Sequence, residues 1–315
     1  MTSYDLTTLG EAQIRLTAHR GGRLATSNDL RLSPAGSEAN VAGLLAQLGR
    51  KTAFASTLPT SDLGQRFANE YRGVGVDLSM CVPCEGRMAL YFMEPGQAPL
   101  PAKVTYDRLH TAFREITPDL FDWDRLLDTR LLFVTGISAA LTENTAGVIT
   151  HAVSAAHERG VKVALDVNYR SLLWSPERAR QVLEPLLAKT SILFCSRLDG
   201  VKVFDLIGDG PSINSTLRER YGLDHVVSTD STAGVYYSGI EGQEVFQVEG
   251  VTVVDRPGAG DSFVGGTLHG YLDDSVREGI NYGLRTSKFA LTHHGDLTHV
   301  SPAELAIPTS TDIVR

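Results

Sequence analysis

The run Asp255-Arg-Pro-Gly-Ala-Gly-Asp261, late in the chain, has the composition of an anion-binding turn with a carboxylate beside it. An apolar, β-branched segment at 251–254 leads into the run, and a small-residue segment with helical spacing follows it at 262–271. Glycines let a backbone approach an anion closely, and a helix start presents free N–H groups and the positive end of its dipole. The run therefore predicts a site that holds an anion next to Asp261.

Phosphoryl transfer is the chemistry that suits this arrangement. A carboxylate accepts the proton of the attacking hydroxyl, and backbone amides hold the charge on the moving phosphoryl group. We predict Asp261 as the general base and the amides of Gly258, Ala259 and Gly260 as the anion hole. A dinucleotide-binding turn and a plain helix cap are the alternatives. The former is disfavoured because the run lacks a third glycine and lies late in the chain.

Composition bounds the class of protein. The 315 residues are 42% hydrophobic and 21% charged, which is ordinary for a globular protein, and the net charge of −8 argues against a nucleic-acid partner. No apolar run approaches the ~20 residues of a membrane span, and the first residues lack the features of a secretion signal. With only three cysteines, we expect a cytoplasmic protein without a membrane partner.

The elements that must position the site alternate between strand and helix. Apolar runs predict strands at 4–9, 52–57, 131–135, 161–167, 192–195, 226–228 and 234–237. Helical spacing predicts helices at 38–48, 62–71, 143–159 and 179–188, with two more after the glycine run. This alternation predicts an α/β domain, with a mainly parallel sheet covered by helices on both faces.

Two segments, 12–34 and 83–110, break the alternation. Neither contains a convincing helix, and both alternate polar and apolar residues around turns such as Gly21-Gly22 and Pro95-Gly96. They predict a small β lid that excludes water from the site, with ordinary edge hairpins as the alternative. The remaining segments, 1–11, 35–82 and 111–315, then form the nucleotide- and substrate-binding domain. Strand edges on a lid also favour a homo-oligomer, a dimer or larger.

A second glycine motif, Gly36-Ser-Glu-Ala-Asn40, opens an early helix. With the late glycine run, the α/β body and the two strand-rich segments, it makes nearly the whole chain resemble the ribokinase-like (PfkB) carbohydrate kinases. The resemblance implies a ribokinase-like three-layer α/β/α fold and an ATP-dependent, Mg²⁺-assisted kinase that phosphorylates a sugar hydroxyl. It implies Asp261 as the base, and Gly36 and Asn40 as residues beneath the sugar.

Further motifs are similar to those of 2-keto-3-deoxygluconate kinases within this family. They are Gly10-Glu11 with Ile14-Arg15-Leu16, Gly22-Arg23-Leu24, Tyr91, Tyr106-Asp107-Arg108, Asp166-Val-Asn168-Tyr-Arg170 with Leu173-Trp174, and His293-His-Gly-Asp296. The resemblance implies phosphorylation of 2-keto-3-deoxygluconate, or a close epimer, at its terminal hydroxyl.

A sugar-acid substrate gives several of these residues a physical reason. Arg108 and Arg170 each offer a planar fork to its carboxylate, and Tyr91 and Tyr106 offer hydroxyls to its oxygens. Asn168 and Asp296 complete the predicted substrate site. A solvated Arg108, a Tyr91 that only packs inside the lid, and an Asp296 that caps a loop are the plain alternatives.

The nucleotide side departs from the family pattern. The family's Asn-x-x-Glu is Ser196-Arg-Leu-Asp199 here, and an expected Lys-x-Gly is Ser228-Thr-Asp230. The predicted nucleotide-binding residues are Ser196, Ser228, Asp230, Gly234, Gly258 and Gly260; those predicted to hold Mg²⁺ through water and phosphates are Asp199 and Asp255. The lost lysine and the added Asp230 predict weak ATP affinity, with a turn-capping Asp230 as the alternative.

Two other functions stay open. One is a different PfkB sugar kinase, of the fructokinase or ribokinase type, whose neutral substrate would not need two arginines. The other is a catalytically weak sensor that binds a sugar acid, suggested by the changed nucleotide side. Retention of Asp261 favours the kinase, because a sensor has no use for a base beside an anion hole.

Overall fold

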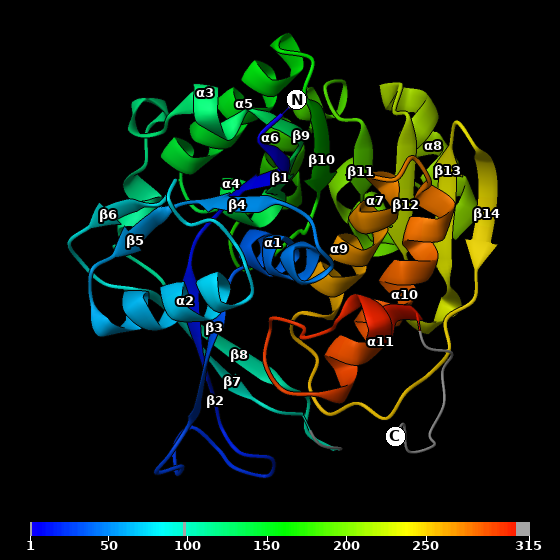
Figure 1. Ribbon diagram of the computed structural model, residues 1–315. Helices are drawn as coiled ribbons and strands as arrows, with labels where there is room; N and C mark the ends of the chain where they lie inside the picture. Colours follow the sequence, from blue (N-terminus) through cyan, green and yellow to red (C-terminus); the bar gives the residue numbers. More distant parts are fainter. Residues whose placement is uncertain (1, 97–98, 307–315) are drawn as a thin grey trace.

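The computed structural model describes residues 2–96 and 99–306, and its centre is an eight-stranded sheet in the order β14-β13-β12-β11-β10-β9-β1-β4 (Figure 1). Neighbouring strands from β12 to β4 are parallel, and β13 and β14 join antiparallel at one edge. The strands are β1 (Tyr4–Leu9), β4 (Thr52–Ala55), β9 (Thr129–Thr135), β10 (Lys162–Asp166), β11 (Ile192–Phe194), β12 (His225–Thr229), β13 (Val235–Gly239) and β14 (Gly242–Phe246).

Helices cover both faces of this sheet. One face carries α5 (Glu143–Glu158), α6 (Pro176–Leu187), α7 (Arg197–Phe204) and α8 (Gly210–Tyr221); the other carries α1 (Ser37–Gln47), α2 (Asp62–Gly73), α9 (Ala259–Tyr271) and α10 (Val276–Thr292). Side chains alternate along each strand, so Leu132 and Val134 of β9 enter one core while Leu131 and Phe133 enter the other. The predicted α/β architecture with a mainly parallel sheet is confirmed.

A second, smaller sheet has the order β3-β2-β7-β8 and lies below α1 in Figure 1. Its strands are β2 (Gln13–Thr17), β3 (Arg31–Ala35), β7 (Ala89–Glu94) and β8 (Lys103–Asp107). We call it the small sheet. Its strands come from the two segments that break the alternation, with β3 reaching one residue beyond 12–34. Gln97 and Ala98 of the predicted lid, and residues 307–315 of the main domain, lie outside the described residues.

The structure differs from the sequence prediction at 52–57 and contains β14, α7 and α8, which were not predicted; it also shows how the apolar segment 251–254 is held. The strand predicted at 52–57 is two strands, because the chain leaves the large sheet at Ser56 and β5 (Thr57–Pro59) pairs with β6 (Val82–Cys84). Residues 251–254 form no strand; the N–H of Val254 instead donates to the carbonyl of Leu291 near the end of α10, at 2.7 Å. Helices α7 and α8 were not predicted, since neither has a strong apolar stripe.

The remaining helical segments are short. They are α3 (Trp123–Leu126), α4 (Gly136–Ala139), α11 (Pro302–Ala306) and single 3₁₀ turns at Ala112–Glu115, Pro118–Leu120 and Ser231–Ala233. Within the described ranges, no helix combines the length and the apolar character that crossing a membrane requires.

Candidate functional site

The site begins at the glycine turn, residues 255–260, which leads into α9. Gly258 caps the helix in the left-handed region, with φ 85°, and a Cβ there would lie 2.0 Å from the backbone oxygen of Asp296. Both facts require glycine at this position. The first helical bond runs from the N–H of Ser262 to the carbonyl of Gly258, at 2.8 Å. The backbone N–H groups before Ser262 therefore have no partner within the helix, and they lie at the positive end of the helix dipole.

Asp261 belongs to this first turn and is held by the start of α1. Its carboxylate accepts hydrogen bonds from Ser37 Oγ at 2.6 Å and Asn40 Nδ2 at 2.7 Å. The Asn40 oxygen in turn accepts from Tyr71 Oη at 2.6 Å, which fixes the orientation of the amide. Burial raises the pKa of Asp261, while the donors Ser37 and Asn40, and then the charge of Arg170, act in the opposite direction. Asp261 is therefore an oriented carboxylate of enhanced basicity.

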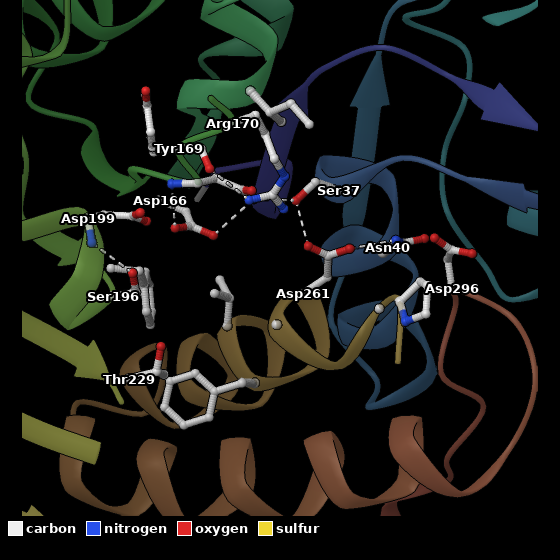
Figure 2. Close-up of a pocket in the computed structure, with 18 of the residues that line it drawn as sticks. Ser37, Asn40, Asp166, Tyr169, Arg170, Ser196, Asp199, Thr229, Asp261 and Asp296 are labelled. Carbon is white, nitrogen blue, oxygen red and sulfur yellow. Dashed lines mark hydrogen bonds between the residues drawn. The ribbon is translucent and has the colours of Figure 1, made fainter. Parts of the chain in front are cut away.

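A cavity of about 590 Å³ opens above Asp261 and is closed on one side by the small sheet (Figure 2). Figure 2 shows Asp261 between Asp296 on one side and Asp166 and Asp199 on the other. The predicted site residues that line this cavity are Gly36, Asn40, Tyr91, Tyr106, Asn168, Arg170, Ser196, Asp199, Gly258, Gly260, Asp261 and Asp296. Chain segments far apart in sequence thus converge where the parallel strands end.

The end of the cavity nearest the small sheet holds a tight polar cluster around Asp296. Tyr91 Oη donates to the Asp296 carboxylate, and Arg15 Nε lies 3.1 Å from its other oxygen. Burial raises the pKa of Asp296 to about 6, and the guanidinium of Arg15 is the largest influence in the opposite direction. Tyr106 packs beside Tyr91 with its ring tilted by 44° and 5.9 Å between ring centroids. This end offers hydroxyl and carboxylate groups to a polyhydroxylated ligand.

Asn168 connects the end of β10 with the Asp261 cluster. It adopts a left-handed backbone with φ 42°, a conformation that asparagine tolerates better than most residues. Its amide nitrogen lies 3.2 Å from both Ser37 Oγ and Asp166 Oδ2. The sequence motif therefore reaches the cavity as predicted, with Asn168 bridging two of its polar groups.

The opposite end of the cavity is acidic. Burial, together with the neighbouring carboxylates of Asp199 and Asp261, raises the pKa of Asp166 to about 7. Burial also raises the pKa of Asp199, which follows the helix cap formed by Ser196 Oγ. A cation would relieve this repulsion, and oxygen ligands suit Mg²⁺ held largely through water. No cluster of three or more potential metal ligands occurs in residues 2–96 and 99–306.

Two charged residues predicted for the site pair elsewhere and do not line the cavity. Arg108 is buried against Glu11, with Nε 2.9 Å from Oε2, so a carboxylate already occupies its guanidinium fork. Asp255 is buried with its Oδ2 2.5 Å from Arg15 Nη2, so its charge is neutralised by an arginine rather than directed at a metal. Both pairings join residues distant in sequence, which local spacing does not reveal.

Three predicted nucleotide residues and one anion-hole residue also lie off the cavity lining. Ser228 faces α8, where it accepts from Asn214 Nδ2 at 3.0 Å, because its strand neighbours Val227 and Thr229 take the cavity face. Asp230 accepts from Arg197 Nε at 2.8 Å. Gly234 and Ala259 are likewise absent from the lining.

Sequence reasoning missed several polar residues of the site. Ser37 lies inside the early glycine motif and Asp166 inside the Asp-x-Asn motif, so both were within reach of a closer interpretation. Glu38, on the other side of α1, is fully buried and accepts from Thr135 Oγ1 and Ser138 Oγ, both at 2.6 Å. Burial raises its pKa to about 7. A charged residue in the first helical turn gave no local signal that it points inward.

Comparisons with known proteins bear on the family and the fold. The model of the family described as pfkB family carbohydrate kinase matches residues 4–303. A 2-dehydro-3-deoxygalactonokinase from Haloferax volcanii is 35% identical, over 96% of this chain and 95% of its own. The structure of 2-dehydro-3-deoxygluconokinase from Thermotoga maritima is similar with a TM-score of 0.90 and 28% identity, covering 96% of this chain and 98% of its own.

A third comparison concerns the fold alone. The structure of fructokinase with bound ATP from Xylella fastidiosa has a TM-score of 0.80 at 20% identity and covers 96% of both chains. The ribokinase-like fold and the resemblance to sugar kinases that act on 2-keto-3-deoxy acids are thereby confirmed, because independent comparisons by sequence and by structure converge on them.

Proposed function

The chain belongs to the pfkB family of carbohydrate kinases, and we propose that it transfers the γ-phosphoryl group of ATP to the terminal hydroxyl of a 2-keto-3-deoxy sugar acid. The observation that carries this proposal is the Asp261 carboxylate, oriented by Ser37 and Asn40 directly beside the amides of the glycine turn. The similarity to the kinases from Haloferax volcanii and Thermotoga maritima supports the choice of acceptor.

In this proposal Asp261 accepts the proton of the attacking hydroxyl. Its raised pKa makes it a stronger base than an exposed aspartate, while the two hydrogen bonds, one to each oxygen, fix the orientation of its carboxylate. The amides of Gly258 and Gly260 hold the equatorial oxygens of the transferring group, where preorganised donors cost no reorganisation during the reaction. The small sheet acts as a lid that keeps water from the site.

Arg170 is the group we assign to the substrate carboxylate. Its guanidinium lies near enough to Asp166, Asp199 and Asp261 to lower the pKa of each. It pairs with no carboxylate within 4.0 Å among the described residues, and its one hydrogen bond goes to the backbone oxygen of Tyr169. Arg108 could contribute only if its buried pair with Glu11 opened.

Mg²⁺ and ATP complete the proposed reaction. The fructokinase from Xylella fastidiosa, which shares the fold, has ATP bound. Mg²⁺ would supply charge neutralisation on the nucleotide phosphates. Asp166 and Asp199, two carboxylates of raised pKa facing one cavity, fit such an ion, and they would hold it through water. The pairing with Arg15 argues against the earlier assignment of Asp255 to the metal.

A substrate panel tests the proposal. ATP consumption is measured with 2-keto-3-deoxygluconate, 2-keto-3-deoxygalactonate, fructose and ribose, for the wild type and Arg170→Met. We expect turnover with the two acids, and a ten- to hundredfold rise in the acid KM for Arg170→Met, the usual cost of a charge-assisted bond of ~1.5–3 kcal/mol. Preference for a neutral sugar, or equal weakening of acid and neutral substrates, would contradict the sugar-acid assignment. Absence of turnover with every sugar would favour a sensor.

A further inference from the structure

Arg15, on β2 of the small sheet, has a fully buried side chain that reaches the two acidic residues flanking the glycine turn. Its Nη2 lies 2.5 Å from Asp255, the first residue of the turn, and its Nε lies 3.1 Å from Asp296. The backbone oxygen of Asp296 packs against Gly258 so closely that a Cβ there would lie 2.0 Å away. One guanidinium from the small sheet thus holds the turn at its start and, through Asp296, at its centre.

The same face of the small sheet carries the tyrosines of the cavity. In the sheet register Ser33 lies opposite Arg15, Arg15 opposite Tyr91, and Tyr91 opposite Tyr106. Side chains directly opposite one another on neighbouring strands share a face, so the four form one row. Tyr91 Oη also donates to Asp296. A ligand that contacts Tyr91 therefore lies against β7, the strand paired with β2 that carries Arg15, and a ligand that contacts Tyr106 lies against β8, the next strand of the same sheet.

We propose that Arg15 is a positioning residue that couples the small sheet to the glycine turn, so that a sugar acid bound against Tyr91 and Tyr106 orders the amides of Gly258–Gly260. The inference rests on the proposed function for the identity of the ligand, whereas the coupling itself rests on the contacts of Arg15. The consequence is that acceptor binding completes the anion hole.

The chemistry of arginine suits this role. Its planar guanidinium donates to Asp255 through Nη2 and to Ser33 through Nε while its charge lies 3.1 Å from Asp296, whereas a lysine ammonium on a flexible stem would neutralise one of the two carboxylates at a time. An apolar side chain of similar size would leave Asp255 and Asp296 buried without their cation. An uncompensated buried charge of this kind strongly destabilises the folded state. The turn would then shift or admit water between the two acids.

Hydrogen–deuterium exchange measures the coupling directly. In the wild type, saturating 2-keto-3-deoxygluconate should slow amide exchange both in strands β7 and β8 and in peptides covering the glycine turn. In Arg15→Lys and Arg15→Met the acid should still protect the strands, and protection of the turn should fall or vanish. Arg23→Met is the matched control, since Arg23 pairs with Glu94 of β7 and, among the described residues, forms no ion pair with the turn. Equal protection of the turn in wild type and both Arg15 variants would overturn the proposal.

Kinetics supply a second readout, which a purely structural role would not produce. At equal folded fraction, verified by circular dichroism, Arg15→Lys should lower kcat with the sugar acid by about ten- to a hundredfold, the scale of a misplaced catalytic group, with a smaller rise in KM. Loss of thermal stability with unchanged kcat would assign Arg15 to folding alone. If the wild type neither binds nor phosphorylates sugar acids, the proposed function fails. In that case the coupling is tested without ligand. If the amides of the glycine turn exchange at the same rate in the Arg15 variants as in the wild type, the coupling is also refuted.

Discussion

Asp261 illustrates how a single side chain acquires a role from its neighbours. We expect Asp261→Asn to retain sugar-acid binding and to lose kcat by roughly 10²–10⁴-fold, because the amide keeps the shape but accepts no proton. Steady-state kinetics and calorimetric binding measure the two quantities. Ser37→Ala, which removes one of the two donors to Asp261, is the control and should cost far less. Near-wild-type turnover of Asp261→Asn would exclude it as the base.

The structure changes the effect on ATP binding that we expect from the charge of Asp230. The sequence predicted repulsion of the nucleotide, on the order of 2 kcal/mol at ~8 Å and an effective dielectric of ~20. In the structure its carboxylate pairs with Arg197 at 2.8 Å, which neutralises that charge. We therefore expect Asp230→Asn to leave the KM for ATP within about threefold of the wild type.

Arg197→Met, which leaves Asp230 unpaired, separates the two interpretations of this carboxylate. If Asp230 faces the nucleotide, its carboxylate without Arg197 repels the phosphates, and ATP titration of this variant should show a KM several-fold above that of the wild type. A several-fold fall in KM for Asp230→Asn would restore the original expectation of repulsion.

At the scale of elements, α9 is held against α10 by glycines that allow backbone contact. A Cβ at Gly279 would lie 2.2 Å from the backbone oxygen of Thr267, and one at Gly270 would lie 2.4 Å from Gly279 Cα. We expect Gly279→Ala to lower the free energy of unfolding by about 1–3 kcal/mol, since the helices must move apart. Because α9 carries Asp261, kcat should fall as well.

Gly147→Ala, on α5, is the matched control for this substitution. Nothing lies within 4 Å of the added Cβ, so only helix propensity changes. We expect it to be neutral or to stabilise the protein by up to about 1 kcal/mol. Denaturant unfolding measures both variants. Equal effects of the two substitutions would mean that α9 and α10 tolerate separation.

At the scale of the whole molecule, buried carboxyls set the pH dependence of stability. Burial raises the pKa of Glu38 from 4.5 to about 7 and the pKa of Asp166 and Asp296 to about 7 and 6. Through these three carboxyls the folded state binds more protons than the unfolded state between about pH 4 and 7, so their contribution to stability falls as pH rises through this window, while burial lowers the pKa of His225, His269, His293 and His294 and so acts in the opposite direction. For Glu38 the loss is of order 3 kcal/mol.

Thermal unfolding between pH 5 and 8 checks this expectation. The Tm of the wild type should decrease with rising pH, and Glu38→Gln, which cannot ionise but keeps an acceptor for Thr135 or Ser138, should flatten the slope. Glu219→Gln, on the exposed side of α8, is the control and should leave the slope unchanged. A Tm that rises steadily to pH 8 would contradict the buried-carboxyl account. The expected homo-oligomer is a separate prediction, which a mass measurement in solution tests.

Local spacing in the sequence was enough to predict the α/β class and the order of most strands and helices, whereas the family was predicted from the resemblance of its motifs to those of known kinases. Those features depend on periodicity and on glycine motifs, which are local properties of the chain. Gly258, for example, adopts a left-handed backbone at the start of one helix, and Gly36 precedes another. The residues that these motifs single out, Asn40, Asn168 and Asp261, line one cavity, because Asn168 follows the end of β10 while Asn40 and Asp261 lie in the first turns of α1 and α9.

Tertiary structure alone decided which charge meets which. Arg108 pairs with Glu11, and Arg15 with Asp255, across separations of 97 and 240 residues that no local pattern encodes. The placement of β12 in the sheet decided which of two neighbouring side chains faces the cavity: Thr229 lines it, while Ser228 points to the opposite face, toward α8. Buried ion pairs form where desolvated groups find a partner in space, so their choice depends on the packed fold, whereas turns and helices depend on the chain itself.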